Sequence, residues 1–342
     1  MPPKRKKSGA LGKVFLSLLF VLQLLIFSYK KSSMPNIFPN DLLDEDRIVE
    51  NSSKSANSFS TAPSRRLERM KMYQERYRYQ PPAQHTNHTA RDEICGSYPH
   101  YKEFFSLNKY MRSDTLNKED YTIYKTFFEK YTSDKSSAPI KGSVVEMGAY
   151  DGLQQSNSRF FEECLGWETM LVEGNPMMYD KLFKNRPHAH RFSYVPSCTE
   201  EEEIANKTIR FDKYPATNGG VADGSVTTAY TVKNWYNDAP CGSLTKVLLD
   251  LFPNGHVSFF SLDVEGAEPM ILRQLDFDKV FIEIMMVENR NTFCKKVCKS
   301  RDEFRKIMSD AGYILFPNLV RKSDVFIHPL STHLKTAQDQ SK

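Results

Sequence analysis

Two apolar runs that end in acidic residues and glycine constrain the fold of this chain more than any other feature. The first, residues 144–152, reads Val-Val-Glu-Met-Gly-Ala-Tyr-Asp-Gly, and the second, residues 259–268, reads Phe-Phe-Ser-Leu-Asp-Val-Glu-Gly-Ala-Glu. Each run predicts a buried strand that leads into a tight turn. Because the carboxyl ends of neighbouring parallel strands face one crevice in an open α/β sheet, we expect both turns to line the same small-molecule site.

The segments around these runs alternate between strand-like and helix-like patterns. We expect strands at residues 143–149, 168–173, 190–195, 257–262 and 280–287, and a closing hairpin of 313–316 and 323–327. Helices are expected at 119–131, 156–165, 177–185, 243–251, 267–275 and 301–311, with an irregular stretch at 200–239. This alternation predicts a Rossmann-like, doubly wound α/β fold whose mostly parallel sheet is covered on both faces.

Composition agrees with a globular enzyme-sized protein. The chain has 342 residues, of which 40% are hydrophobic, 12% aromatic and 26% charged, as expected for one domain with extensions. The formal net charge of +5 is modest, and much of it lies near the N-terminus. The charge therefore gives no reason to expect a nucleic-acid partner.

An apolar run at residues 14–29 follows a basic segment and ends before Lys30 and Lys31. As a helix that rises about 1.5 Å per residue, this run spans roughly 24 Å, close to the thinner membranes of the early secretory pathway. No small-x-small cleavage motif follows it, so we expect an uncleaved signal anchor rather than a cleaved signal peptide. The excess of basic residues before the run predicts a cytosolic tail at 1–13. The protein is then a single-pass type II membrane protein of the endoplasmic reticulum or Golgi, with its catalytic domain in the lumen.

Residues 30–95 are expected to form a disordered luminal stem, because serine, asparagine, proline and charged residues dominate there. A short solvated helix is expected between Arg65 and Tyr79. A folded domain at 96–335 and a polar tail at 336–342 complete the predicted organisation. Three Asn-x-Ser/Thr sequons, at Asn51, Asn87 and Asn206, agree with a luminal glycoprotein.

Cysteine usage also fits an oxidising compartment. An even number of cysteines predicts disulfides, although their spacing does not choose the pairing. Cys294 and Cys298 are close enough in sequence to suggest a zinc site. No second pair of ligands follows at a plausible spacing, so we expect disulfides instead. The six residues are Cys95, Cys164, Cys198, Cys241, Cys294 and Cys298.

The first turn points to a ligand that carries positive charge. Gly148 and Gly152 let the backbone run close beneath a ligand, and Glu146 and Asp151 flank the turn with acceptors. A dinucleotide-binding turn would read Gly-x-Gly-x-x-Gly, and the middle glycine is absent here. Glu173 ends the second strand, where a carboxylate can accept hydrogen bonds from both hydroxyls of a ribose. These features suggest an adenosine ligand without a phosphate chain, and S-adenosylmethionine fits that description.

Three blocks of the sequence resemble the FkbM-type methyltransferases. They are residues 145–152, Leu-Val-Glu-Gly-Asn-Pro at 171–176 and Ser-Leu-Asp-Val-Glu-Gly-Ala-Glu at 261–268. The resemblance implies a class I methyltransferase fold, S-adenosylmethionine as cofactor, and methyl transfer to hydroxyls of sugars or small metabolites. On this basis the predicted cofactor-binding residues are Glu146, Gly148, Tyr150, Asp151, Gly152, Glu173 and Asn175.

The first block departs from the family's usual Asp-x-Gly-Ala-Asn-x-Gly. Glu146 stands in place of the aspartate, and Tyr150 and Asp151 precede the second glycine. This variant is similar to the membrane-anchored branch of the family that contains the arthropod protein Star, which assists the export of growth-factor precursors. A non-catalytic trafficking or cargo-binding factor with a methyltransferase fold is therefore the alternative hypothesis.

The second run supplies the candidate catalytic residues. The resemblance places Asp263 and Glu265 near the transferred methyl group, and on a strand their side chains would point to the same side. Asp263 is the first candidate for the base that accepts the proton of the acceptor, and Glu265 is the second. Glu268 is expected to begin the next helix, where a carboxylate interacts favourably with the helix dipole. A divalent ion at Asp263, Glu265 and Glu288 is conceivable but not expected.

The sequence thus predicts an S-adenosylmethionine-dependent O-methyltransferase. Its acceptor is expected to be a glycan or another hydroxylated molecule of the secretory-pathway lumen, and protein cargo is the partner expected under the alternative hypothesis. The irregular stretch around Asn218, Gly219 and Gly220 is expected to fold over the cofactor as a lid that binds the acceptor.

Overall fold

The computed structural model describes residues 62–83, 119–129, 141–212, 220–221, 236–289 and 294–340. All of them belong to one unit, Ser60–Lys342. The predicted anchor at 14–29 and most of the predicted stem lie outside the described residues. Among the helices that are described, none combines the length and hydropathy needed to span a bilayer.

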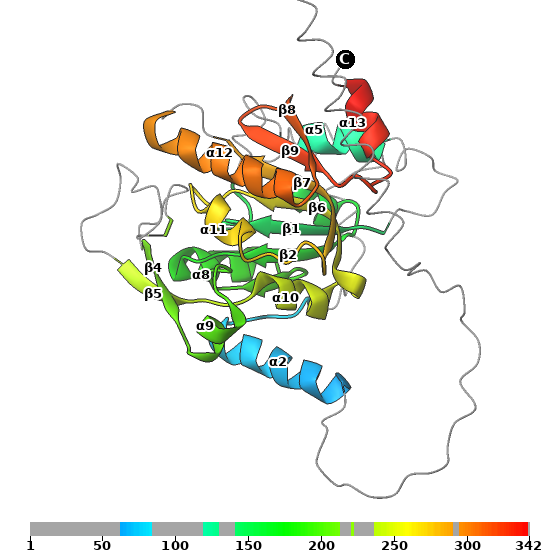
Figure 1. Ribbon diagram of the computed structural model, residues 1–342. Helices are drawn as coiled ribbons and strands as arrows, with labels where there is room; N and C mark the ends of the chain where they lie inside the picture. The colour runs from blue at the N-terminus through cyan, green and yellow to red at the C-terminus, as the bar shows by residue number, and fades with distance from the viewer. Residues whose placement is uncertain are drawn as a thin grey trace, which may run out of the picture. The chain divides into compact units, whose positions relative to one another are not determined.

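The central sheet has seven strands in the order β3-β2-β1-β6-β7-β9-β8 (Figure 1). Five strands run parallel, and β8 and β9 form an antiparallel hairpin at one edge. The chain order reverses between β1 and β6, which is the switch point where α/β sheets bind ligands. The predicted Rossmann-like sheet and its closing hairpin are therefore confirmed. The strands are β1 (Ser143–Met147), β2 (Glu168–Val172), β3 (His190–Phe192), β6 (His256–Leu262), β7 (Phe281–Glu288), β8 (Ile314–Val320) and β9 (Ser323–Ile327).

Helices cover both faces of the sheet because alternate strand residues are apolar toward each side. Val145 and Met147 of β1 lie in one core, and Val144 lies in the other. The first core is covered by α10 (Leu244–Leu251), α11 (Glu268–Leu272) and α12 (Cys294–Asp310). The second face carries α5 (Glu119–Ile123), η2 (Tyr124–Phe128), α7 (Arg159–Glu163), α8 (Pro176–Asn185) and α13 (Leu334–Gln340).

Helix α2 (Ala62–Arg76) lies within the segment that was predicted to be a solvated stem. The helix itself is confirmed, but its solvation is wrong, because Tyr73, Tyr77 and Tyr79 are buried in the first core. Beyond the helix, the N–H of Gln80 donates to the carbonyl of Arg191 in β3 at 3.0 Å, and the reverse bond measures 3.1 Å. The folded domain therefore begins well before residue 96, and α2 is part of it (Figure 1, blue).

The stretch at 200–239 was predicted to be irregular, and its described part is not. It contains α9 (Glu200–Ile204) and an antiparallel pair, β4 (Thr208–Asp212) and β5 (Tyr236–Pro240), which stands apart from the main sheet. A disulfide between Cys198 and Cys241, with Cα atoms 5.6 Å apart, closes this insertion at its base. A single turn, η3 (Pro253–Gly255), then leads into β6.

The C-terminal tail predicted at 336–342 is also wrong where it is described. Residues 334–340 form α13, and Ala337 is fully buried in the second core.

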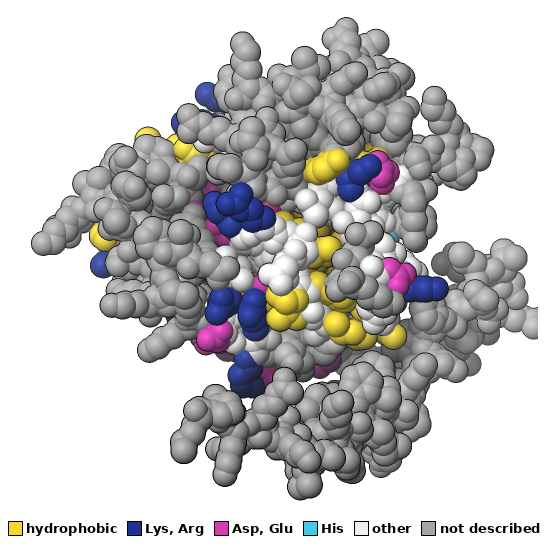
Figure 2. Space-filling view, turned by 90° about the horizontal axis from the view of Figure 1, so that it is seen from above, with side chains coloured by type: hydrophobic (Ala, Val, Ile, Leu, Met, Phe, Trp, Pro, Cys, Tyr) yellow, Lys and Arg dark blue, Asp and Glu magenta, His cyan; other side chains and the backbone are white. Residues whose placement is uncertain are grey.

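Seen from above in Figure 2, the described Lys and Arg side chains lie beside Asp and Glu side chains, with hydrophobic side chains between them. On that described face, charges of both signs are therefore interspersed.

Candidate functional site

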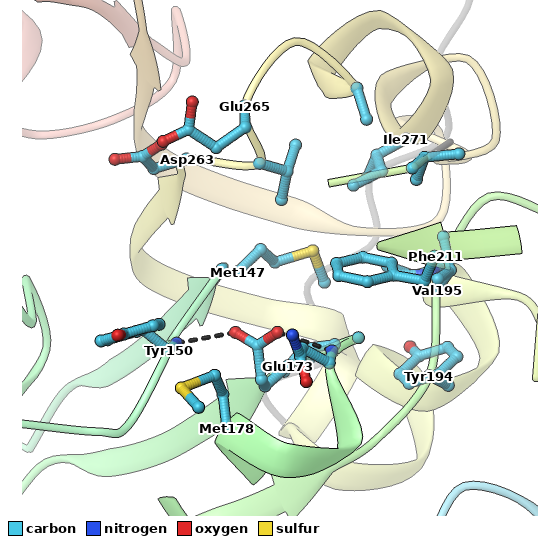
Figure 3. A pocket seen from close by; sticks show the side chains of 18 residues that line it. Met147, Tyr150, Glu173, Met178, Tyr194, Val195, Phe211, Asp263, Glu265 and Ile271 are labelled. Carbon is cyan, nitrogen blue, oxygen red and sulfur yellow. Dashed lines mark hydrogen bonds between the residues drawn. The ribbon is translucent and has the colours of Figure 1, made fainter. Parts of the chain in front are cut away.

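A cleft opens at the carboxyl ends of β1, β2 and β6. Its lining runs from an acidic end at Asp263 and Glu265, past Glu173, to an aromatic end at Tyr194 and Phe211 (Figure 3). The predicted juxtaposition of the two strand-end turns is therefore confirmed. A cleft at the topological switch point of the sheet is typical of a small-ligand site.

The turn after β1 needs glycine because it passes against the end of β6. Gly148 has φ of +80°, and a Cβ there would collide with the carbonyl oxygen of Asp263. The N–H of Asp263 also donates to the carbonyl of Met147 at 3.1 Å, so the two turns are in direct contact. Gly148 and Tyr150 both line the cleft, as the cofactor prediction requires.

Glu173 lies one residue beyond β2 and occupies the middle of the cleft. One carboxylate oxygen accepts the N–H of Tyr150 at 2.8 Å, and the other accepts the N–H of Asn175 at 2.7 Å (Figure 3). Each oxygen keeps a second lone pair, so the carboxylate can still accept two hydroxyl donors. Burial raises the pKa of Glu173 to about 7. Asn175 also lines the cleft, and its side chain caps α8 by accepting the N–H of Met177 at 3.0 Å.

Glu146, a predicted cofactor contact, does not line the cleft. Its carboxylate is buried on the other side of β1 and accepts the hydroxyl of Ser156 at 2.8 Å, the N–H of Asn157 at 2.7 Å and the N–H of Ser158 at 3.3 Å. The alternation along β1 explains this position, because the neighbours of Glu146 face the first core and Glu146 must face the second. The residue anchors the chain that follows the turn.

Asp151 and Gly152 are likewise absent from the cleft lining. The Asp151 carboxylate accepts the N–H groups of Leu153 at 2.9 Å and Gln154 at 2.8 Å, so it shapes the turn instead of meeting a ligand. A Cβ at Gly152 would come within 2.7 Å of Cγ of Arg186, whose guanidinium donates to the Gly152 carbonyl at 2.9 Å. Both residues therefore have structural roles in the turn, and their contacts with a cofactor stay predictions.

A buried ion pair stabilises the region around Glu146 and the turn after β1. Arg186 is fully buried, and its guanidinium pairs with Glu162 and donates to the hydroxyls of Ser156 at 3.0 Å and Ser158 at 3.1 Å. These serines are also bonded to Glu146, so one polar network joins β1, α7 and the end of α8. Buried charges persist only when paired and hydrogen-bonded, as they are here.

The acidic end of the cleft gathers three carboxylates from two strand ends. Oxygen atoms of Asp263, Glu265 and Glu288 lie within 4.8 Å of one another. Glu265 has a left-handed φ of +58°, a conformation that is costly for a residue other than glycine and that recurs at functional sites. Burial and the charges of Glu288 and Glu265 raise the pKa of Asp263 well above its ordinary value. Such a set of oxygen atoms could hold a divalent ion or share a proton.

Glu268 has the structural position that was predicted for it. It is the first residue of α11, and its carboxylate accepts the N–H groups of Val264 at 3.3 Å and Gly266 at 3.0 Å. Burial raises its pKa to about 7. It thus holds the turn that presents Glu265.

The aromatic end of the cleft was missed by the sequence interpretation. Tyr194 and Val195 follow β3, Phe211 belongs to β4, and Val221 bridges to Phe211. Val221 lies within the expected lid segment, of which residues 213–219 and 222–235 are outside the described residues.

Comparisons with known proteins agree with this geometry. Residues 146–315 match the family model described as the methyltransferase FkbM domain. No curated protein matches the chain. Among solved structures, it is similar to fibrillarin from Aeropyrum pernix with natively bound S-adenosyl-L-methionine, at 12% identity over 56% of this chain and 68% of that chain, with a TM-score of 0.29.

Two further structures are similar at the same low level. A TehB-like SAM-dependent methyltransferase from Corynebacterium glutamicum is 11% identical over 71% of this chain and 100% of that chain, with a TM-score of 0.31. The plantazolicin methyltransferase BamL, solved with SAH, is 9% identical over 73% of this chain and 84% of that chain, with a TM-score of 0.33. The family match spans both strand-end turns of the cleft, and it therefore supports the FkbM methyltransferase family for residues 146–315.

Proposed function

We propose that this protein is an S-adenosylmethionine-dependent methyltransferase that methylates a hydroxyl group of a glycan or another acceptor in the secretory-pathway lumen. The observation that carries the proposal is the order of groups along the cleft of an FkbM domain. A carboxylate, Glu173, stands between an acidic end at Asp263 and Glu265 and an aromatic end at Tyr194 and Phe211. That order matches the three chemical parts of the cofactor.

The residues present fit each of those parts. The apolar and aromatic surface of Phe211 and Val195 suits a flat base, and Glu173 has lone pairs for the two hydroxyls of a ribose. The acidic end favours the ammonium and sulfonium charges of the methionine part. When bound, S-adenosylmethionine supplies an electrophilic methyl group.

The chain's own contribution to the reaction is orientation and proton transfer. A base must accept the hydroxyl proton as the acceptor oxygen attacks, and Asp263 is our candidate. Its raised pKa makes its ionised form a stronger base than an ordinary aspartate. The other carboxylates near it stabilise the protonated form that results.

A luminal location has one structural argument in its favour. The Cys198–Cys241 disulfide closes the insertion that supplies the aromatic end of the cleft. Disulfides persist in oxidising compartments such as the endoplasmic reticulum lumen. This agrees with the signal anchor proposed at 14–29 and with a type II orientation.

The proposal is tested by titrating S-adenosylhomocysteine into the purified full-length protein in a calorimeter, followed by transfer of labelled methyl groups from S-adenosylmethionine to a panel of glycans. We expect binding, and we expect Asp263→Asn to slow transfer by about 10²- to 10⁴-fold while cofactor binding is retained. Absence of binding by folded protein would contradict the enzyme hypothesis. It would favour the alternative, a cargo-binding factor that resembles Star.

A further inference from the structure

Tyr194 carries a buried polar atom that the domain itself does not use. The residue is 1% exposed, and its hydroxyl has no hydrogen-bond partner among the described residues. Burying a hydroxyl without a partner costs about 1 to 3 kcal/mol. Such a group in a native domain therefore calls for a physical reason.

The position of Tyr194 supplies that reason, because the residue lines the cleft at its aromatic end. In the view of Figure 3 its hydroxyl points into the cleft, toward the side where Phe211 and Glu173 lie. Glu173 is the proposed ribose ligand, so the space beside it on this side is where the base of a nucleoside would lie. A polar atom there meets the edge of the base, which carries both donors and acceptors.

The ring of Tyr194 is held in place from behind by other aromatic rings. It stacks on Tyr77 with centroids 4.5 Å apart, and it contacts Phe192 at 5.9 Å. Tyr77 is itself fixed, because its hydroxyl donates to the buried carboxylate of Glu203. The hydroxyl of Tyr194 is thus presented at a set position by α2, β3 and α9.

The protonation state of Tyr194 and the position of Phe211 bear on how a ligand reaches the Tyr194 hydroxyl. Burial raises the pKa of Tyr194 well above its ordinary value, so the group is neutral and can both donate and accept. The ring of Phe211 lies over the backbone of Gly174, where a Cβ would come within 2.5 Å of it. Phe211 belongs to the separate β4–β5 pair.

We propose that Tyr194 is a specificity-determining residue that recognises the base of the bound nucleoside by a hydrogen bond from or to its hydroxyl. The inference rests on the proposed function, because it takes S-adenosylmethionine as the ligand of the cleft. It assigns to Tyr77, which directly follows α2 and lies outside the family match at 146–315, the role of positioning this residue.

The test compares Tyr194→Phe with the wild type in the full-length protein. Two probes are titrated, S-adenosylhomocysteine and S-ribosylhomocysteine, which is the same molecule without the base. We expect Tyr194→Phe to weaken S-adenosylhomocysteine binding by about tenfold, because the base loses one hydrogen bond. Affinity for S-ribosylhomocysteine should be the same in both proteins.

Tyr73→Phe is the matched control. The Tyr73 hydroxyl is buried beside the same aromatic cluster, but it donates to Asp250 at 2.9 Å and does not line the cleft. We expect Tyr73→Phe to lower the melting temperature and leave both affinities unchanged. Tyr194→Phe should leave the melting temperature of the ligand-free protein unchanged or raise it, because it removes an unpaired hydroxyl.

The outcomes separate the two proposals. Equal affinity of wild type and Tyr194→Phe for S-adenosylhomocysteine would overturn the role of Tyr194 and leave the methyltransferase intact. Equal weakening of both probes would also overturn it, because the base would not be the group recognised. Failure of the wild type to bind S-adenosylhomocysteine at all would overturn the proposed function and this inference with it.

Discussion

Glu146 and Glu173 occupy equivalent places in the sequence, near the ends of adjacent strands and shortly before a glycine, yet they do different things. Both are buried, at 4% and 6% exposure. Glu146 lies inside β1 and is bonded to Ser156, Asn157 and Ser158 behind the sheet. Glu173 lies just beyond β2 and faces the cleft. Position relative to the strand end, and not residue type, decides whether such a carboxylate supports the fold or meets a ligand.

The largest expected effect is a loss of stability when Glu146, the carboxylate behind the sheet, is substituted. Glu146→Ala leaves the buried donors of Ser156, Asn157 and Ser158 without their acceptor and removes a negative charge close to Arg186. We expect the free energy of unfolding to fall by about 3 to 5 kcal/mol, measured by urea denaturation. Glu201→Ala, at an exposed site on α9, is the control, and a loss below about 1 kcal/mol for Glu146→Ala would break the comparison.

Substitution of Glu173, the carboxylate in the cleft, should weaken ligand binding and lower stability less than substitution of Glu146 does. Glu173→Gln keeps the side-chain volume but removes the charge that accepts hydroxyl donors. We expect the affinity for S-adenosylhomocysteine to fall at least about tenfold, since hydrogen bonds to a charged group contribute about 1.5 to 3 kcal/mol. Urea denaturation should show a smaller loss than for Glu146→Ala. Unchanged affinity would mean that Glu173 is also a structural residue.

The raised pKa of Glu173 predicts how binding depends on pH. Burial raises this pKa to about 7, so the folded protein holds the proton more tightly than the unfolded chain does, where the pKa is near 4.5. The stability that the protonated group contributes is present below the unfolded pKa and is lost as the pH rises through about 7. Binding of hydroxyl donors needs the ionised form, so affinity should increase between about pH 6 and about pH 8.

Calorimetric titration at several pH values checks this dependence. Glu119 and Glu268 also have pKa values raised to about 7, so a matched variant is needed to identify the group. Glu173→Gln serves here, because its affinity should lose the increase near pH 7. An increase that persists in the variant would assign the titration to another carboxylate.

The smallest effect is expected at Asp151, which was predicted to touch the cofactor. Its carboxylate accepts N–H groups of its own turn and is not in the cleft lining. Asp151→Asn keeps an oxygen acceptor for those bonds, so the affinity should stay within about threefold of the wild type. A larger loss would show that the Asp151 side chain contacts the ligand, in addition to Tyr150 and the backbone of the turn.

The parts of the fold that sequence predicted were those with local periodicity. The strands of the main sheet follow from apolar runs, and Gly148 follows from a turn that passes another strand. The burial of α2 was missed because Arg, Lys and Glu side chains surround Tyr73 and Tyr77, although a spacing of four residues places both rings on one helical face. The β4–β5 pair was missed because β5 reads Tyr-Asn-Asp-Ala-Pro without alternation, so the alternating residues of β4 had no evident partner strand.

The candidate site was predicted in part for a similar reason. Asp263, Glu265 and Glu173 stand at strand ends, which a sequence can locate. The face of the sheet on which the Glu146 side chain lies could have been inferred from its place between Val145 and Met147, whose side chains face the opposite core. The aromatic end could not be inferred, because Tyr194, Phe211 and Val221 come from three segments that only the tertiary fold joins.

The contact between Gly148 and the end of β6 makes the two halves of the site one rigid frame. With no space for a methyl group between the Gly148 backbone and the Asp263 carbonyl, neither turn can shift without pushing the other. The position of Asp263 relative to the turn after β1 is then set during folding and does not await a closing motion. The β4–β5 pair forms a separate sheet and is not part of this frame.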